Sequence, residues 1–101
     1  MSKKYEGKYE PTLVYTSLIK LVAKRRRYGI EKHGDSEDWR TTPEYKHHDA
    51  MMRHLLADID GEPCDENGDD HLVALVTTAM FELERRYGGA HKTVLRKRGD
   101  Q

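Results

Sequence analysis

Two apolar segments with helical spacing bracket a long polar stretch, and this arrangement limits what the chain can fold into. The first segment runs from Leu13 to Ala23 and the second from Leu72 to Leu83. In both, apolar residues recur every three or four positions, which is the period of one helix face. No part of the chain shows the strict polar–apolar alternation of a strand. The sequence therefore predicts an all-α fold, a compact three- to four-helix bundle.

The size and composition of the chain favour one small domain that associates with itself. The 101 residues suit a single domain, 1–101, with a modest core. The apolar fraction of 36% and the charged fraction of 36% compare with roughly 45–50% and about 25% in typical domains. So little apolar material favours burial between subunits, and we expect a homo-oligomer. The polar end segments 1–10 and 90–101 are expected to be flexible or peripheral.

Charge, cysteine content and hydropathy exclude several classes of protein. The net charge is zero, so phosphate binding requires local clusters of basic residues, and a nucleic-acid partner is disfavoured. Cys64 is the only cysteine, which rules out a disulfide within the chain and suggests a reducing compartment. No apolar run approaches the ~20 residues that span a bilayer, and residues 1–10 do not resemble a signal peptide. We therefore expect a cytoplasmic protein without a membrane partner.

Capping residues predict where the first and third helices begin and end. Pro11 suits the first turn of a helix. This helix is expected to close with the cations at 24–27, most of which suit a solvated helix end, and Gly29 is the candidate C′ residue. Asp69 or Asp70 is expected to cap a third helix that stops at the glycine pair 88–89. The apolar stripe of each helix is expected to face the core.

The segment 41–60 predicts a second helix inside the polar stretch. Thr41 and Glu44 have the spacing of a capping box at its start. The apolar stripe expected to face the core consists of Tyr45, Met52, Leu56 and Ile59. Asp49 lies on the same stripe and would need a partner there, because an unpaired buried charge is costly. Arg53, one turn further on, is the candidate.

Acidic and histidine side chains crowd the polar stretch and suggest a metal site. They are Glu31, Asp35, Asp49, His54, Glu62, Asp65, Asp69, Asp70 and His71. Mg²⁺ prefers carboxylate oxygens and completes its coordination with waters and phosphate oxygens. Zinc is not indicated, because the chain has one cysteine and no His-Glu-x-x-His motif. The alternative for Glu62, Asp65 and Asp69 is loop solvation and helix capping. His48 and Asp49 form a His-Asp pair like the one in HD-type phosphohydrolases. Neighbouring residues of a helix point about 100° apart, so this pair would need further metal ligands from other helices.

Arginines and aromatic residues beside the acidic centre are candidate nucleotide ligands. Arginine binds phosphate oxygens in a bidentate way and stays charged, and Arg27 and Arg53 adjoin the acidic residues. There is no glycine-rich phosphate loop, so side chains, helix N-termini or a metal would hold a phosphate. Tyr28, Trp39 and Tyr45 offer aromatic faces on which a base can stack, although core packing is the more common role of a tryptophan.

An ordered series of short motifs in the central stretch resembles one known family. The motifs are Arg26-x-Tyr28-Gly29, Lys32-His33-Gly34, Trp39-Arg40, Tyr45, Asp49-Ala50, Arg53-His54-Leu55, Gly61-Glu62, Asp65 and His71-Leu72. In this order they resemble the small phage and bacterial dATP/dGTP diphosphohydrolases. These proteins are similar to the wider group of all-α, MazG-like nucleoside triphosphate pyrophosphohydrolases.

The resemblance implies a reaction and a set of site residues. The reaction is hydrolysis of a dNTP to the dNMP and pyrophosphate, with Mg²⁺ (or Mn²⁺) held by Asp49, Glu62 and Asp65. By motif position, catalytic roles are implied for Glu31, Asp49, His54 and His71. Substrate binding is implied for Arg27, Tyr28, Lys32, Trp39 and Arg53. One charged hollow among the helices is expected to bring together Glu31, Asp49, His54, Glu62 and His71.

The sequence also departs from the family pattern, and this keeps three functions open. Ala74 stands where a second histidine is usual, Thr78 replaces an asparagine, and Asp38 replaces the asparagine before Trp39. The Glu-x-x-Glu helix of MazG-type enzymes is absent. The leading function is a Mg²⁺-dependent dNTP pyrophosphohydrolase acting on a small-molecule nucleotide. The first alternative is a non-catalytic nucleotide-binding module of the same fold, such as a phage protein that sequesters a nucleotide signal. The second is a nucleic-acid-binding or interaction bundle that uses basic clusters at 24–27 and 96–98.

Overall fold

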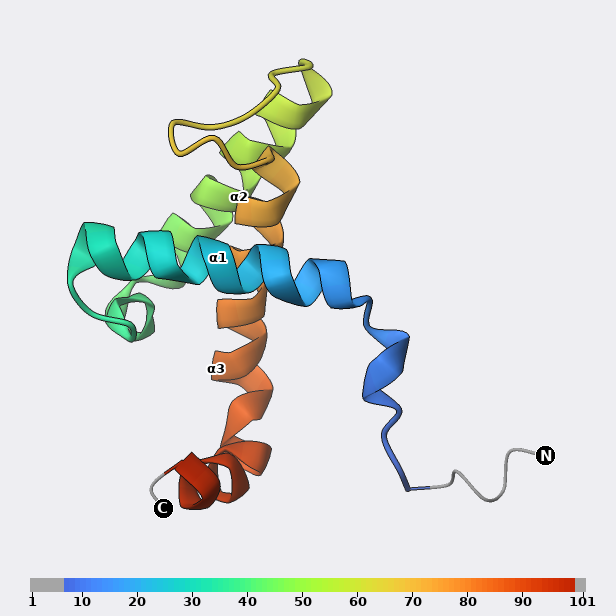
Figure 1. Cartoon of the computed structure of the whole chain (residues 1–101). Helices are drawn as coiled ribbons and strands as arrows, with labels where there is room; N and C mark the ends of the chain where they lie inside the picture. Colours follow the sequence, from blue (N-terminus) through green and yellow to red (C-terminus); the bar gives the residue numbers. More distant parts are fainter. Residues whose placement is uncertain (1–6, 100–101) are drawn as a thin grey trace.

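The structure, a computed structural model, describes residues 7–99, and Figure 1 shows how they are arranged. Its three α-helices are α1 (Thr16–His33), α2 (Glu44–Ile59) and α3 (His71–Gly99). Two short 3₁₀ turns precede α1 and α2, namely η2 (Pro11–Leu13) and η3 (Asp38–Thr41). Residues 7–99 contain no strand, so the prediction of an all-α fold is confirmed. In this part of the chain no helix combines the length and hydropathy needed to cross a membrane.

The three helices form a crossed arrangement around one antiparallel pair. α2 and α3 lie side by side, run in opposite directions and are joined by the loop 60–70 (Figure 1). α1 lies across this pair and packs mainly on α3, and η3 also contacts α3. The predicted helix bundle is therefore one in which the first helix crosses the other two. This crossing brings the end of α1 close to the loop 60–70.

α1 begins and ends later than its capping residues predicted. Pro11 belongs to the separate turn η2, and α1 continues through Gly29 to His33. Gly34 ends the helix in the left-handed conformation, with φ 77°, and its N–H donates to the Ile30 carbonyl at 2.7 Å. Glycine in a helix costs only about 1 kcal/mol relative to alanine. No residue between Gly29 and Gly34 breaks the helix, so the helix continues past Gly29 and ends at Gly34.

The capping box predicted at the start of α2 is wrong. The Thr41 hydroxyl donates to the Asp38 carbonyl inside η3, and no side chain caps α2. Pro43 occupies the N-cap position instead. The turn η3 takes priority because it carries Trp39, whose side chain is buried in the small core. Burial of an indole outweighs one capping hydrogen bond, which is worth about 1 kcal/mol.

α3 has the predicted start but not the predicted end. The Asp70 carboxylate accepts a hydrogen bond from the Leu72 backbone N–H at 2.8 Å, so Asp70 is the cap. The helix then runs through Gly88 and Gly89 to Gly99. Both glycines lie inside this helix, so neither makes the left-handed turn that ends a helix. Residues 1–6 and 100–101 lie outside the described part of the chain, as do the side chains of residues 89–99, which include the basic cluster 96–98.

The loop 60–70 makes a compact connection between α2 and α3. It turns at Gly61 and Gly68, whose φ angles of 82° and 83° are in the region that favours glycine. The Asp65 N–H donates to the Asp69 carbonyl at 2.9 Å, and the Gly68 N–H donates to the Asp65 carbonyl at 3.0 Å. These bonds fold the loop back on itself, so the carboxylates of Asp65 and Asp69 both reach Arg25.

The apolar stripe predicted for α2 faces away from α3, and the two helices meet through small apolar residues and buried polar side chains. The stripe residues are largely exposed, at 61% for Tyr45, 54% for Met52, 51% for Leu56 and 68% for Ile59. The buried residues of the pair are instead His47 and Ala57 on α2 and His71, Val73, Ala74, Thr77 and Glu82 on α3. The stripe was predicted to face the core, and this was wrong. The reason is that histidines on α2 form hydrogen bonds with side chains of α3, and these bonds offset the desolvation cost of burying the histidines.

Candidate functional site

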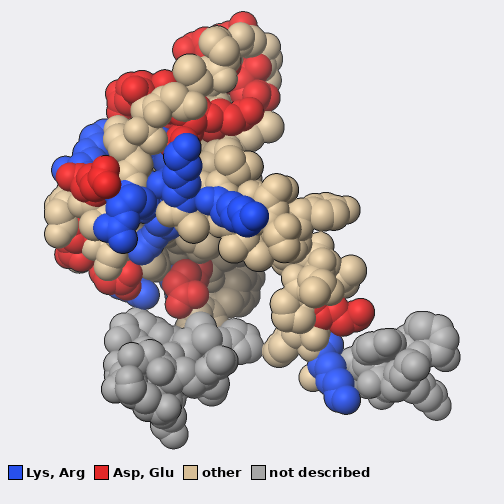
Figure 2. Space-filling view, in the orientation of Figure 1, with Lys and Arg blue, Asp and Glu red and all other residues tan. Residues whose placement is uncertain are grey.

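Two hollows adjoin where α1 meets the other helices, and Arg25 and Lys32 line both of them. The aromatic cavity, of about 310 Å³, is lined by residues of α1, η3, α2 and α3 that include Tyr28, Trp39, Lys46, His47, Ala74, Thr78 and Phe81. The acidic hollow, of about 500 Å³, is lined by Arg25, Lys32, Arg53, His54, Glu62, Cys64, Asp65, Glu66 and His71. Figure 2 shows basic side chains gathered over α1 and acidic ones over the neighbouring loop.

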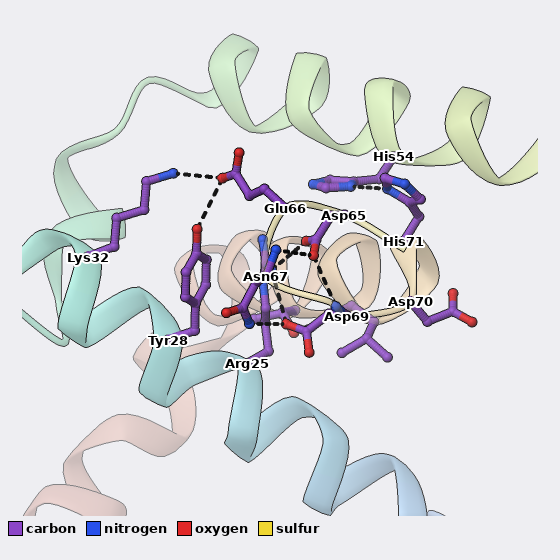
Figure 3. A network of polar contacts seen from close by, with 12 residues as sticks. Arg25, Tyr28, Lys32, His54, Asp65, Glu66, Asn67, Asp69, Asp70 and His71 are labelled. Atoms are coloured by element: carbon purple, nitrogen blue, oxygen red, sulfur yellow. Dashed lines mark hydrogen bonds and ion pairs between the residues drawn. The ribbon is translucent and has the colours of Figure 1, made fainter. Parts of the chain in front are cut away.

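Arg25 of α1 holds the loop 60–70 against the helix (Figure 3). Its Nη1 donates to Asp65 Oδ2 at 2.6 Å and to Asp69 Oδ2 at 3.1 Å. Asp65 Oδ1 accepts further hydrogen bonds from the backbone N–H groups of Asn67 and Asp69. Burial raises the pKa of Asp65, but these backbone bonds and the Arg25 guanidinium together hold it below its usual value. Asp65 is therefore an ionised carboxylate whose oxygens are already used by donors of the protein.

Tyr28 and Lys32 continue the same face of α1, because they follow Arg25 at helical spacing. The Tyr28 hydroxyl donates to Glu66 Oε1 at 3.0 Å, and Lys32 Nζ donates to the same oxygen at 3.3 Å. The hydrogen bonds from Tyr28 and Lys32 lower the pKa of Glu66, and the bond to Glu66 raises the pKa of Lys32. This face thus offers two cations and a phenol, which are groups that bind phosphate oxygens and here bind carboxylate oxygens.

His54 of α2 and His71 of α3 face each other across the helix pair (Figure 3). Their Nδ1 atoms are 2.9 Å apart, so one ring donates a proton to the other. Burial, with help from Arg25 and the other ring, lowers the pKa of His54. The buried Nε2 of His71 has no hydrogen-bond partner among residues 7–88, whose side chains the structure describes, and Glu62 Oε1 lies 3.9 Å from it. The acidic hollow is therefore lined by a histidine that has one unpaired, buried ring nitrogen.

Trp39 is both a core residue and part of the aromatic cavity. Its ring stacks on Phe81 with centroids 4.7 Å apart and planes 5° apart. The guanidinium of Arg26 lies 5.2 Å from the Phe81 ring centroid, and that of Arg40 lies 4.4 Å from the Trp39 ring. Trp39 Nε1 is buried and has no hydrogen-bond partner among residues 7–88, whose side chains the structure describes. The lining of the cavity therefore combines aromatic surface, positive charge and an indole with an unused donor.

A buried polar network ties the connection between α1 and α2 to α3. His47 Nδ1 and Arg85 Nη2 both bond to Glu82 Oε2. Arg85 Nη1 donates to the carbonyls of Arg40 at 3.2 Å and Thr42 at 2.7 Å. Burial raises the pKa of Glu82, but the bonds from Arg85 and His47 lower it to about 2. One ionised carboxylate thus fixes an imidazole and a guanidinium beside the aromatic cavity.

The structure gathers some of the predicted site residues and leaves others apart. The acidic hollow contains Lys32, Arg53, His54, Glu62, Asp65 and His71, and the aromatic cavity contains Tyr28, Lys32 and Trp39. Glu31, Asp49 and Arg27 are exposed and line neither hollow. Of the five residues expected to converge, His54, Glu62 and His71 do so. Because Asp49 is exposed, it needs no buried partner, and its role and those of Glu31 and Arg27 stay predictions.

Several residues that the motifs do not point to contribute to the two hollows. Arg25, Lys46, His47 and Phe81 line them, and Glu82 and Arg85 lie behind His47 and bond to each other and to its ring. Arg25 was expected to be part of a solvated helix end, yet its side chain is only 18% exposed. Extending the face of Tyr28 and Lys32 back by one turn would have found it. His47 and Glu82 lie on different helices, and nothing in the sequence relates them.

The carboxylates expected to hold Mg²⁺ do not form a common site. Among the described residues, no three His, Cys, Asp or Glu side chains lie close enough together to bind a metal ion. Asp49 is exposed on α2, the Glu62 side chain is 61% exposed, and Asp65 is bound to Arg25. The residues therefore do not fit a divalent ion in this arrangement of the loop 60–70.

Comparison with known proteins supports the resemblance seen in the motifs. No curated protein and no solved structure matches the chain. A family model described as "dATP/dGTP diphosphohydrolase, N-terminal" matches residues 1–93. This range includes α1, α2 and the loop 60–70, which all line the hollows. That match spans nearly the whole chain. The chain therefore belongs to the family of dATP/dGTP diphosphohydrolase N-terminal domains.

Proposed function

We propose that this chain binds a deoxynucleoside triphosphate and hydrolyses it to the dNMP and pyrophosphate. One observation carries the proposal: an aromatic cavity and a charged hollow adjoin, and Arg25 and Lys32 line both. A nucleotide has the same two parts, a flat apolar base and a polyanionic tail. Membership of a family named for dATP and dGTP supports a nucleotide as the small-molecule partner.

The face formed by Arg25, Tyr28 and Lys32 would receive the phosphates. Its donors now hold the carboxylates of Asp65 and Glu66 at 2.6–3.3 Å, which are ordinary distances for phosphate oxygens too. A triphosphate would replace these carboxylates on the helix. Arginine at the junction of the two hollows would then offset the negative charge that develops on the phosphate oxygens during hydrolysis.

His71 is the best-placed group to take a proton from an attacking water. Its Nε2 is buried without a partner, and the Glu62 carboxylate at 3.9 Å would stabilise the imidazolium. The water oxygen would bond to the α-phosphorus while the bond to the bridging oxygen breaks and releases pyrophosphate. Dependence on Mg²⁺ or Mn²⁺ stays a prediction from the resemblance, and none of these residue roles requires it.

The test is pyrophosphate release from dATP or dGTP in the presence of Mg²⁺. We expect release above a buffer control, and a loss of about 100-fold or more in kcat with His71→Ala, as is typical for removal of a general base. Thermal unfolding of the variant, measured in parallel, would show that it is folded. Absence of release with every common dNTP and NTP would contradict the proposal.

A non-catalytic nucleotide-binding module is the second candidate, and one observation favours it. Ala74 and Thr78, which replace a histidine and an asparagine of the family pattern, both line the aromatic cavity. A cavity that has lost two polar groups can keep its shape and affinity while losing turnover. This function predicts stoichiometric binding by calorimetry and recovery of the nucleotide unchanged after denaturation. Recovery of dNMP would exclude it.

A further inference from the structure

His47 is a buried imidazole in the wall of the aromatic cavity, and it belongs to none of the motifs that the family resemblance uses. Its side chain is 9% exposed, and it comes from the first half of α2. Phe81, the ring that stacks on Trp39, lies against it with centroids 6.1 Å apart and planes tilted by 40°. A histidine in this position needs a reason, because an alkyl or phenyl side chain would fill the space without a polar cost.

The two ring nitrogens of His47 have different surroundings. Nδ1 faces the Glu82 carboxylate, which is ionised at neutral pH, and Arg85 Nη2 lies 3.1 Å from the same nitrogen. Because Arg85 Nη2 donates to Glu82 Oε2, this oxygen accepts from both groups, and Nδ1 keeps its proton and donates it to Glu82. Nε2 lies on the opposite edge of the ring and makes no hydrogen bond to the residues whose side chains the structure describes, 7–88. In the neutral ring, a proton on Nδ1 leaves a lone pair on Nε2, which is then an acceptor.

The partners of His47 also fix where its ring can lie. Arg85 bonds to Glu82 from the same side and donates to the carbonyls of Arg40 and Thr42, which come just before α2. The carboxylate is thus held between two elements and cannot follow the ring if the ring turns. A histidine held through a carboxylate in this way has a set tautomer and a set direction for its second nitrogen.

We propose that His47 is a specificity-determining residue of the aromatic cavity, and that Glu82 and Arg85 are positioning residues that hold its Nε2 as an acceptor. The inference rests on the proposed function, since it takes the ligand to be a nucleotide. At about 310 Å³, the cavity is at the low end of the roughly 300–1,000 Å³ of ligand sites and suits a base rather than a whole nucleotide. Nε2 would accept a hydrogen bond from a ring N–H or an exocyclic amino group of that base.

Trp39 makes the site selective for a second feature of the base. Its buried Nε1–H has no partner among the described residues and is a donor only. A base that presents an N–H beside a carbonyl or ring nitrogen would satisfy both residues. A base that lacks the N–H would leave one buried polar group unpaired, which discriminates more strongly than a missing apolar contact.

Calorimetry with matched variants and matched ligands tests the inference. The variants are His47→Phe, which keeps a ring but removes both nitrogens, and His48→Phe at the adjacent exposed position. The ligands are dATP, dGTP and inorganic tripolyphosphate, which has no base. We expect His47→Phe to weaken dATP or dGTP about tenfold and to leave tripolyphosphate within twofold. We expect His48→Phe to change neither. An equal loss for all three ligands, or no loss, would overturn the inference.

The positioning role has its own readout, and the first part of this readout uses the wild-type protein alone. In ¹⁵N-labelled wild-type protein at neutral pH, the ring nitrogen shifts of His47 should show a proton on Nδ1 and none on Nε2. In Glu82→Gln, the carboxamide can accept or donate, so a mixture of tautomers should appear. A proton on Nε2 in the wild-type protein would overturn the role of Glu82. The quantities compared are binding affinities and ring-nitrogen shifts, and the calorimetry is done without added divalent metal. Failure to release pyrophosphate would therefore contradict the proposed reaction and leave this inference standing.

Discussion

Arg25 of α1 and Asp65 of the loop 60–70 form a 2.6 Å ion pair between residues 40 positions apart in the sequence. The Arg25 side chain is 18% exposed and that of Asp65 is 7% exposed, so water screens this pair less than a surface pair. Asp69 shares the same guanidinium nitrogen. This one arginine therefore connects the first helix to the loop between the other two.

Replacement of Arg25 should destabilise the protein more than replacement of any exposed arginine. Arg25→Met leaves two partly buried carboxylates without their cation, and we expect a loss of about 2–4 kcal/mol in the free energy of unfolding. Arg27→Met, at an exposed position on the same helix, should change it by less than about 0.5 kcal/mol. Urea denaturation measures both. Equal midpoints for the two variants would show that the ion pair contributes nothing.

The Glu82 network should make stability depend on pH in an acidic range. The pKa of Glu82 is about 2 in the folded protein, against 4.5 for the unperturbed group. Between these values the folded state binds fewer protons than the unfolded chain, so stability should fall as the pH falls from about 5 towards 2. Glu82→Gln should lose about 1–3 kcal/mol at pH 7 and show a smaller pH dependence in this range. The comparison requires denaturation curves at several pH values, and parallel curves for the two proteins would contradict it.

The exposed apolar side chains of α2 should form a contact between copies of the chain. Met52, Leu56 and Ile59 follow at spacings of four and three residues, share one face and are at least half exposed. A face of this kind is unusual on a monomer. Light scattering should give a mass above that of one chain for the wild-type protein and a monomer mass for Leu56→Glu. Asp58→Lys, a charge change at a neighbouring exposed position, serves as the control and should remain associated. A monomeric wild-type protein would exclude the homo-oligomer.

Glu62 and Glu31 should respond differently to the same substitution if the acidic hollow is the reaction site. Glu62 lines this hollow 3.9 Å from His71, whereas Glu31 is exposed and lines neither hollow. Glu62→Gln should lower kcat/KM for dATP at least tenfold, and Glu31→Gln should lower it less than twofold. Pyrophosphate release measures both. A large loss with Glu31→Gln would mean that the role implied by its motif position is exercised in another arrangement of the chain.

Periodicity predicted the helices well because it depends only on neighbours along the chain. It predicted three helices close to 16–33, 44–59 and the first part of 71–99, although the first was expected to end before Gly29 and the third to stop at the glycine pair 88–89. Asp70 was one of the two caps expected for the third helix. It could not say which face of α2 meets α3, because that choice depends on pairs such as His47 with Glu82. The interaction energy of such a pair depends on residues of both helices. The pattern of apolar residues along one helix therefore cannot predict it.

The same limit explains which site residues were found. His54, Glu62 and His71 were grouped through a family resemblance, and the fold brings them to one hollow. Arg25 was assigned to helix capping, because the loop that neutralises it lies forty positions away. Asp49 was expected to face inward with the stripe, and it faces outward because the stripe does.

Gly61 and Gly68 set the path of the backbone that carries the acidic side chains, and as glycines they have no side chain of their own. A residue with a β-carbon at either position would be strained at these φ angles and would shift the chain between them. Alanine there would leave every carboxylate in the sequence and yet change which of them reaches the arginine. Which charges pair in this region therefore depends on the two glycines as much as on the charged residues.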